Sequence, residues 1–153
     1  MSSYKIRIDT KEQTLQLLRD QRLVHQFPIS TSRFGLGQES GSLQTPLGRF
    51  RIYEKIGGDQ PLNTVFRGRQ PVANPPDWEE ESDLITSRIL WLDGVEPHNL
   101  NTRQRFIYIH GTNEEHLIGQ PASHGCIRMR NVDVVRVFDL VEAGTEVEIV
   151  GQG

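Results

Sequence analysis

The sequence predicts a mainly β domain, either a sandwich or a barrel-like sheet, with one principal helix near its C-terminal end. Short segments that alternate apolar and polar residues recur along the chain and are separated by turn residues. Only residues 131–143 have the spacing of an amphipathic helix. The 153-residue chain contains no internal repeat or linker, so we expect one domain over residues 1–153.

Each strand is expected where such alternation is bounded by turn residues. The seven strands predicted on this basis cover residues 4–8, 14–18, 23–30, 50–55, 87–92, 105–110 and 145–150. Asn131 is a favourable N-cap for the helix, which should run to about Ala143 and end before Gly144. One helix among seven or eight short strands is typical of a β sandwich or barrel.

Two segments are expected to be irregular. Residues 32–42 contain three glycines and read as a surface loop that opens no helix, so they do not form a phosphate-binding loop. Residues 57–83 contain Pro61, Pro71, Pro75 and Pro76, each of which interrupts a helix or a central strand. Loops of this length are either functional or solvated, so both a lid and a passive loop stay open.

The composition indicates a soluble globular protein. Lysine and arginine number 17 against 20 aspartate and glutamate residues, a net charge of −3 that gives no general attraction to nucleic acid or anionic lipid. No run approaches the ~18 apolar residues of a membrane span. Residues 1–9 lack the pattern of a secretory signal, which predicts a cytoplasmic location. The alternative is a periplasmic or cell-wall protein whose leader is absent from this chain.

The only cysteine, Cys126, lies in the segment Pro121-Ala-Ser-His-Gly-Cys-Ile-Arg-Met-Arg130. A lone cysteine is usually a buried packing residue, and composition alone favours that role. However, Ser123, His124 and Gly125 form a polar, turn-prone approach to it. A thiol near an imidazole can be held as a thiolate, and nearby backbone N–H groups can face a carbonyl. We therefore expect Cys126 to be a nucleophile.

His110 is the candidate partner of this thiol. It closes the apolar strand of residues 106–110 and precedes Gly111 and Thr112, which places it next to a loop. An imidazole that accepts or shares the thiol proton would supply thiolate at neutral pH, so cysteine, histidine and a turn rich in N–H groups are the components of an acyl-transfer site.

Zinc is the competing chemistry, because three histidines and the cysteine offer nitrogen and sulfur ligands. The set would be His110, His116, His124 and Cys126. Their spacing matches no common zinc pattern and no Cys-x-x-Cys is present. We therefore expect no metal and no cofactor.

The motifs together resemble the L,D-transpeptidase catalytic domain of the YkuD family. That family combines a strand-end histidine with a Ser/Thr-His-Gly-Cys box, here Ile109-His-Gly-Thr112 and Ser123-His-Gly-Cys-Ile-Arg128. The turn Thr45-Pro-Leu-Gly-Arg-Phe50 is similar to the family's Thr-Pro-x-Gly-x-Phe element. The likeness runs from about Ser30 to Val150. Some members carry serine at the position of Gly111 or asparagine at that of Arg128.

The resemblance implies a β-rich fold in which Cys126 attacks a peptide carbonyl and forms a thioester. His110 would activate the thiol, His124 would shape the pocket, and the N–H groups of Gly125 and Cys126 would form an oxyanion hole. Arg128 would bind or orient substrate. Ser123, Gly111 and Thr112, from the same motifs, complete the expected substrate-binding set. What orients the His110 ring is left open.

The substrate that the resemblance implies is a peptidoglycan stem peptide, cleaved between the L-centre of a diamino acid, commonly meso-diaminopimelate, and D-alanine. Because no export signal is visible, the sequence favours an L,D-carboxypeptidase that trims tetrapeptides, free or sugar-linked, in cytoplasmic murein recycling. An exported L,D-transpeptidase that forms cross-links is the alternative. A non-catalytic peptidoglycan-binding domain is the hypothesis from another class.

Overall fold

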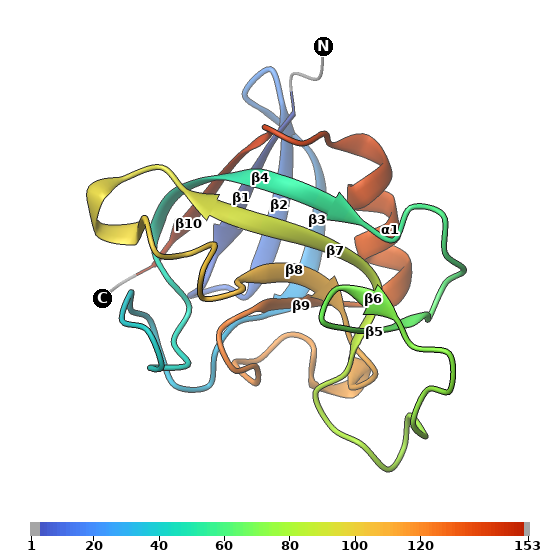
Figure 1. The fold of residues 1–153 in the computed structure, drawn as a ribbon. Coiled ribbons are helices and arrows are strands. Elements are labelled where there is room, and N and C mark those ends of the chain that lie inside the picture. Colours follow the sequence, from blue (N-terminus) through green and yellow to red (C-terminus); the bar gives the residue numbers. More distant parts are fainter. Residues whose placement is uncertain (1–3, 152–153) are drawn as a thin grey trace.

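The structure is a computed structural model that describes residues 4–151. The strands of this part of the chain belong to one sheet, and a single α-helix and two short 3₁₀ turns accompany them (Figure 1). The strands are β1 (Tyr4–Asp9), β2 (Thr14–Arg19), β3 (Arg22–Ser30), β4 (Gly48–Ile56), β5 (Val65–Arg67), β6 (Gln70–Pro71), β7 (Ile85–Gly94), β8 (Tyr108–Gly111), β9 (Ile127–Met129) and β10 (Glu146–Val150). The helices are α1 (Asn131–Leu140), η1 (Pro97–Asn99) and η2 (Glu115–Leu117).

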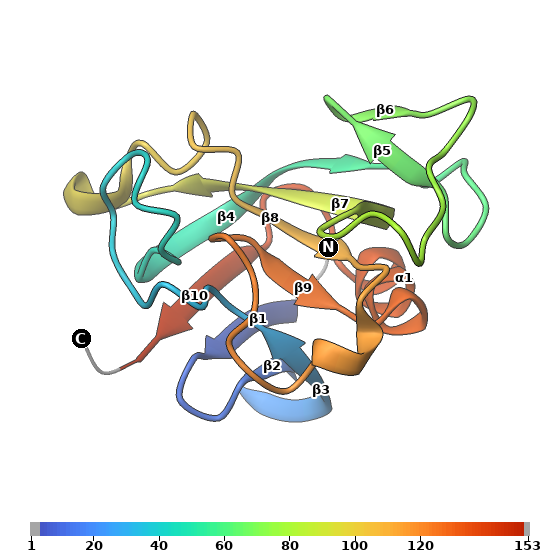
Figure 2. The ribbon, with the colours of Figure 1, turned by 90° about the horizontal axis from the view of Figure 1, so that it is seen from below.

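Eight of these strands close into a barrel. The order β4-β10-β1-β2-β3-β9-β8-β7 returns to its start because β7 also pairs with β4. The hairpin β5–β6 is attached to β7 and extends outside this ring (Figure 2). The barrel-like fold class and its single α-helix are therefore confirmed for the described residues.

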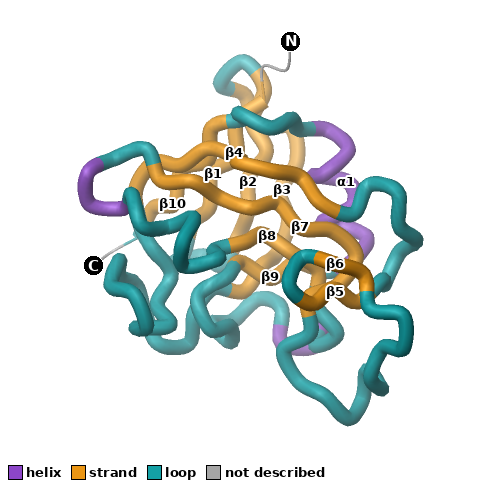
Figure 3. The backbone as a smooth tube through the Cα atoms, in the orientation of Figure 1, coloured by secondary structure: helices purple, strands orange, loops and turns teal. Residues whose placement is uncertain are grey.

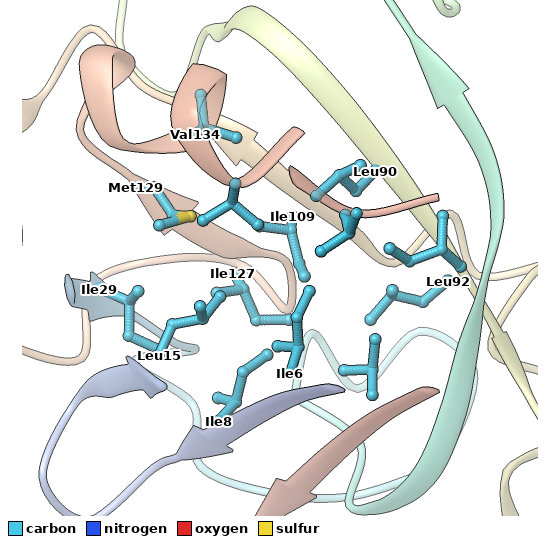
Figure 4. Close-up of a cluster of buried hydrophobic side chains, with 14 of the residues drawn as sticks. Ile6, Ile8, Leu15, Ile29, Leu90, Leu92, Ile109, Ile127, Met129 and Val134 are labelled. Atoms are coloured by element: carbon cyan, nitrogen blue, oxygen red, sulfur yellow. The ribbon is translucent and has the colours of Figure 1, made fainter. Parts of the chain in front are cut away.

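The core fills the barrel because alternate residues of each strand point inward. Ile6, Ile109 and Ile127 are fully buried and face one another from three strands (Figure 4). Helix α1 packs against β7 and β8 and adds the buried Val134 and Val137 to the same cluster. This packing fixes β8 and β9 rigidly, and the site is built on these two strands.

The helix differs from its prediction at both ends. Arg130, not Asn131, is the N-cap, and the helix ends at Leu140 rather than near Ala143. The Asn131 side chain does not cap the helix because it points into the protein and bonds β7 and the loop after β8. The helix was predicted too long because the apolar pattern continues past Leu140. Val141 is also buried, but its backbone is extended and not helical.

One strand prediction was also wrong in extent. The strand expected over residues 105–110 begins only at Tyr108, because Arg105 and Phe106 close a turn and Phe106 has a φ of +56°. Residues 57–83, which were expected to be largely irregular, contain one short hairpin, β5–β6. Pro71 is tolerated there because β6 is an edge strand, which needs no donor from every residue.

The longer loops lie largely below β8 and β9 in the view of Figure 3. The pairing of β8 with β9 is parallel, so the chain must cross over between them through residues 112–126. Among residues 4–151 no helix is long and apolar enough to cross a membrane.

Candidate active site

Strand β8 directs the His110 side chain to the outer face of the barrel, where it is nevertheless buried. Ile109 points into the core, so its neighbours Tyr108 and His110 point to the opposite face. His110 is nevertheless only 2% exposed. Its Nδ1 lies 2.5 Å from the carbonyl oxygen of Gly111. Because a carbonyl can only accept, Nδ1 carries the proton and Nε2 keeps its lone pair. The group that orients this ring is thus the next residue's own backbone.

Burial also fixes the charge of this imidazole. It lowers the pKa of His110 to about 4, against the opposing effects of the Gly111 hydrogen bond and the nearby Asp83 carboxylate. The ring is therefore neutral at pH 7, with a free basic nitrogen.

Cys126 is half-buried directly before β9, and its sulfur is held by backbone groups at the first residue of β8 and just before it. The Tyr108 N–H donates to Sγ at 3.4 Å, and the thiol donates to the Phe106 carbonyl at 3.3 Å. Burial raises the pKa of the Cys126 thiol above its usual range, although the Tyr108 N–H and the Arg128 and Arg105 charges oppose the shift. The resting pair is a neutral thiol and a neutral imidazole, not the preformed thiolate that the sequence suggested.

The structure brings His110, His124 and Cys126 to one cavity, as the motifs predicted. This cavity has a volume of about 70 Å³, and Asp83 and Ile85 complete its lining. A thiol and a neutral imidazole around one small cavity can carry out nucleophilic attack with proton transfer.

His124 lies at the rim of this cavity and is partly exposed. Its Nε2 accepts from Arg33 Nη2 at 3.3 Å, since arginine can only donate. Its Nδ1 lies 2.9 Å from Asp83 Oδ2, although the angle is not that of a hydrogen bond. The ring is thus held between a cation and an anion that come from different loops.

Asp83 is a site residue that sequence reasoning missed. Its Oδ1 lies 2.5 Å from Nη2 of Arg128, which is 1% exposed, and Glu114 lies 3.4 Å from the same guanidinium. Asp83 therefore connects Arg128 to His124. Only its position at the end of an acidic run marks it in the sequence. Arg128 is engaged by these carboxylates, and its contact with substrate stays a prediction.

The conformation of the cysteine loop is fixed by two hydroxyl groups. Ser123 is buried, donates to the Cys126 carbonyl at 2.6 Å and accepts from the Gly125 N–H at 3.3 Å. Thr45, from the Thr-Pro-Leu-Gly turn, donates to the Gly125 carbonyl at 3.0 Å. Gly125 has a φ of +122°, which other residues rarely adopt. Ser123 thus positions the loop, and a substrate contact by it stays a prediction.

Gly111 and Thr112 are tied to the start of α1. A Cβ on Gly111 would lie 2.5 Å from Asn131 Oδ1, so no larger residue fits without a shift. Thr112 is fully buried, and its carbonyl accepts from Asn131 Nδ2 at 2.8 Å. Both residues shape the backbone next to His110, and their predicted substrate contacts remain untested.

The described residues contain no candidate metal site. Within residues 4–151 no group of three or more histidine, cysteine, aspartate or glutamate side chains is placed to hold a metal ion.

A closed β barrel that presents a thiol and a buried, neutral imidazole defines a class of protein with a cysteine–histidine site. The profile of the YkuD family, the L,D-transpeptidase catalytic domain, matches residues 3–149. The chain belongs to this family.

Curated relatives carry the same family name. The chain is 30% identical to the "Putative L,D-transpeptidase YkuD" of Bacillus licheniformis over 146 residues, which are 95% of this chain and 65% of that protein. It is 48% identical to the "Putative L,D-transpeptidase YqjB" of Bacillus subtilis over 105 residues, 69% of this chain and 51% of that protein. The chain thus spans less than two thirds of the length of either relative.

Solved structures show the same fold at low identity. An L,D-transpeptidase from Xylanimonas cellulosilytica superposes with a TM-score of 0.65 at 20% identity, over 97% of this chain and 61% of that one. An L,D-transpeptidase from Mycobacterium smegmatis gives 0.65 at 17% identity, over 97% and 59%.

Proposed function

We propose that this domain catalyses cysteine-dependent acyl transfer at the L,D bond between a diamino acid and D-alanine in peptidoglycan stem peptides. One observation carries the proposal: Cys126 and His110 line the same small cavity, and the bond from His110 Nδ1 to the Gly111 carbonyl leaves Nε2 as the unprotonated nitrogen of a neutral ring. Membership of the L,D-transpeptidase catalytic domain family supports the bond and the substrate class.

The first half-reaction forms a thioester. His110 Nε2 accepts the thiol proton while Sγ forms a bond to the carbonyl carbon of the L-centre. The C–N bond then breaks, D-alanine leaves, and its nitrogen takes the proton from His110. Attack and deprotonation occur together in this scheme, because both resting groups are neutral.

The oxyanion of the tetrahedral intermediate would be bound by the backbone N–H of Cys126, and by that of Gly125 once it leaves its present acceptor, Ser123 Oγ. The positive φ of Gly125 sets the direction of this turn, and Ser123 and Thr45 hold it. Preorganised donors of this kind stabilise charge that develops only in the transition state.

The second half-reaction needs an acceptor, and a second cavity offers space for one that carries an amine. A cavity of about 300 Å³ also includes His124 in its lining, so the two cavities meet at this ring. A second stem peptide could enter there; its amine nitrogen would form the bond to the thioester carbonyl carbon and lose a proton to His110, the C–S bond would break, and the proton would return to the departing Cys126 thiolate. This reaction is L,D-transpeptidation. Hydrolysis by water, as an L,D-carboxypeptidase in cytoplasmic murein recycling, stays the prediction of the sequence.

Product analysis separates these outcomes. The purified domain is incubated with a disaccharide-tetrapeptide, with and without an added amine acceptor, and the products are followed by mass spectrometry. Cross-linked or amine-capped products together with free D-alanine support transpeptidation. Tripeptide alone, even with acceptor present, supports the carboxypeptidase. Intact substrate in both arms contradicts the proposed function.

A non-catalytic binding domain is tested separately with a carbapenem, which acylates active members of this family. Wild-type protein should gain the mass of the drug, and Cys126→Ala should not. Stem-peptide binding without any such mass increase would favour the binding domain instead.

A further inference from the structure

Arg69 occupies the tip of the β5–β6 hairpin in a backbone conformation that its residue type disfavours. Gly68 and Arg69 have φ values of +55° and +65°, a turn in which glycine, asparagine and aspartate are preferred. Such strain persists where surrounding structure enforces it, and it often marks function. Phe66, buried on the same hairpin, holds the hairpin against the outer face of the barrel.

The Arg69 side chain lies on an aromatic surface beside the nucleophile. Its guanidinium stacks 4.8 Å from the Trp91 ring centre and 5.0 Å from that of Phe106, and it donates to the Tyr108 hydroxyl at 3.0 Å. The backbone N–H of the same Tyr108 donates to Cys126 Sγ. One tyrosine residue therefore spans the distance between the guanidinium and the thiol.

This half-buried cation has no anionic partner. Within the described part of the chain no carboxylate lies within ion-pair distance of Arg69, whereas Arg67 on the same hairpin pairs with Glu81 at 2.9 Å. Arg69 also lines an open cavity of about 440 Å³, to which Glu54 and Asp59 contribute. The lining of this cavity thus includes an arginine that no carboxylate of the described residues neutralises, together with two carboxylates.

We infer that Arg69, Glu54 and Asp59 bind the zwitterionic α-amino acid end of the side chain of the residue whose carbonyl Cys126 attacks. This inference rests on the proposed function and makes Arg69 a specificity-determining residue. The guanidinium fork matches a carboxylate, and the two acids match an ammonium group. meso-Diaminopimelate carries both groups at its D-centre. Lysine carries only the ammonium, so it lacks the group that Arg69 binds.

The test compares two tetrapeptides that differ only in their third residue, meso-diaminopimelate or L-lysine. Arg69→Gln should lower kcat/KM for the diaminopimelate peptide by roughly 10- to 100-fold, the value of a lost charge-assisted hydrogen bond, and leave the lysine peptide within about twofold. Arg67→Gln, which removes an arginine from the same hairpin, should change neither. An equal loss for both peptides, or no loss for either, overturns the inference.

A binding experiment separates failure of this inference from failure of the proposed function. Calorimetry measures the affinity of both peptides for Cys126→Ala, alone and combined with Arg69→Gln. Selective loss of diaminopimelate-peptide affinity supports the inference even where wild-type protein releases no D-alanine. Equal affinity with and without Arg69 contradicts it, and thermal melting of each variant establishes that the protein is folded.

Discussion

At His110 a single carbonyl and complete burial decide the chemistry of the site. The Gly111 carbonyl selects the tautomer, and desolvation keeps the ring neutral. The same two features could not be read from the sequence, which identified His110 as a base but gave no partner for its ring.

This depressed pKa makes a prediction about stability. In the unfolded chain the imidazole binds a proton below about pH 6.5, but in the folded protein only below about 4. The unfolded state therefore gains protons first, so the contribution of His110 is full above pH 6.5 and is lost as the pH falls toward 4. The loss between pH 7 and pH 4.5 should be about 2–3 kcal/mol.

His110→Asn is the matched variant, because its amide can still donate to Gly111 but does not titrate. Urea unfolding at both pH values should show a larger acid loss for wild type than for His110→Asn. Equal losses in the two proteins would mean that His110 is not held neutral by burial.

Asp83 neutralises the buried guanidinium of Arg128. Asp83→Asn removes the negative charge 2.5 Å from Arg128 and leaves Glu114 at 3.4 Å as the remaining carboxylate. Because Asp83 is partly exposed and Glu114 remains, we expect a loss of about 1–3 kcal/mol in the free energy of unfolding, less than for a fully buried pair. Chemical denaturation measures it, with the exposed Glu79→Gln from the same loop as control. A loss no greater than that of the control would contradict this role.

At the scale of elements, Asn131 joins α1 to β7 and to the loop after β8. Its Oδ1 accepts from the Thr86 and Ser87 hydroxyls at 2.5 and 2.6 Å, and its Nδ2 donates to the Thr112 carbonyl. This side chain therefore fixes the backbone that follows His110. The sequence suggested a helix cap, because local pattern cannot reveal a partner 45 residues away.

Asn131→Ala leaves these buried groups without their partner. We expect the free energy of unfolding to fall by about 2–4 kcal/mol, measured by urea titration, because unsatisfied buried polar groups cost about 1–3 kcal/mol each. Val132→Ala, at a neighbouring position that is 62% exposed, should change it by less than about 0.5 kcal/mol. Similar values for the two variants would show that the Asn131 bonds contribute nothing net.

At the scale of the whole molecule, the sequence predicted most strands but not how the sheet closes. Alternation located β1, β2 and β3 within a residue or two, because a half-buried strand has a local period. The β7–β4 pairing that closes the barrel and the parallel β8–β9 pairing are set by packing between distant segments. Cys126 and His110 were predicted because they lie in local motifs. Asp83 and Arg69, on the 57–83 segment, were not, because their positions also depend on packing between distant segments.

That closure gives the molecule one outer face on which β7, β8, β9 and the β5–β6 hairpin meet. Tyr108, Trp91, Phe66 and Cys126 share a hydrophobic cluster there. The barrel interior is filled by a separate core. The thiol therefore lies against the outer cluster, and the main core lies on the opposite face of the same strands.

We propose that Cys126 forms a thioester with the stem peptide as D-alanine leaves. The most direct measurement follows intact protein mass and free D-alanine together, in wild type and Cys126→Ala, after mixing with a diaminopimelate tetrapeptide. We expect a transient mass increase equal to the bound tripeptide acyl group and release of D-alanine in wild type, and neither in Cys126→Ala. Release of D-alanine by folded Cys126→Ala at the wild-type rate would contradict it.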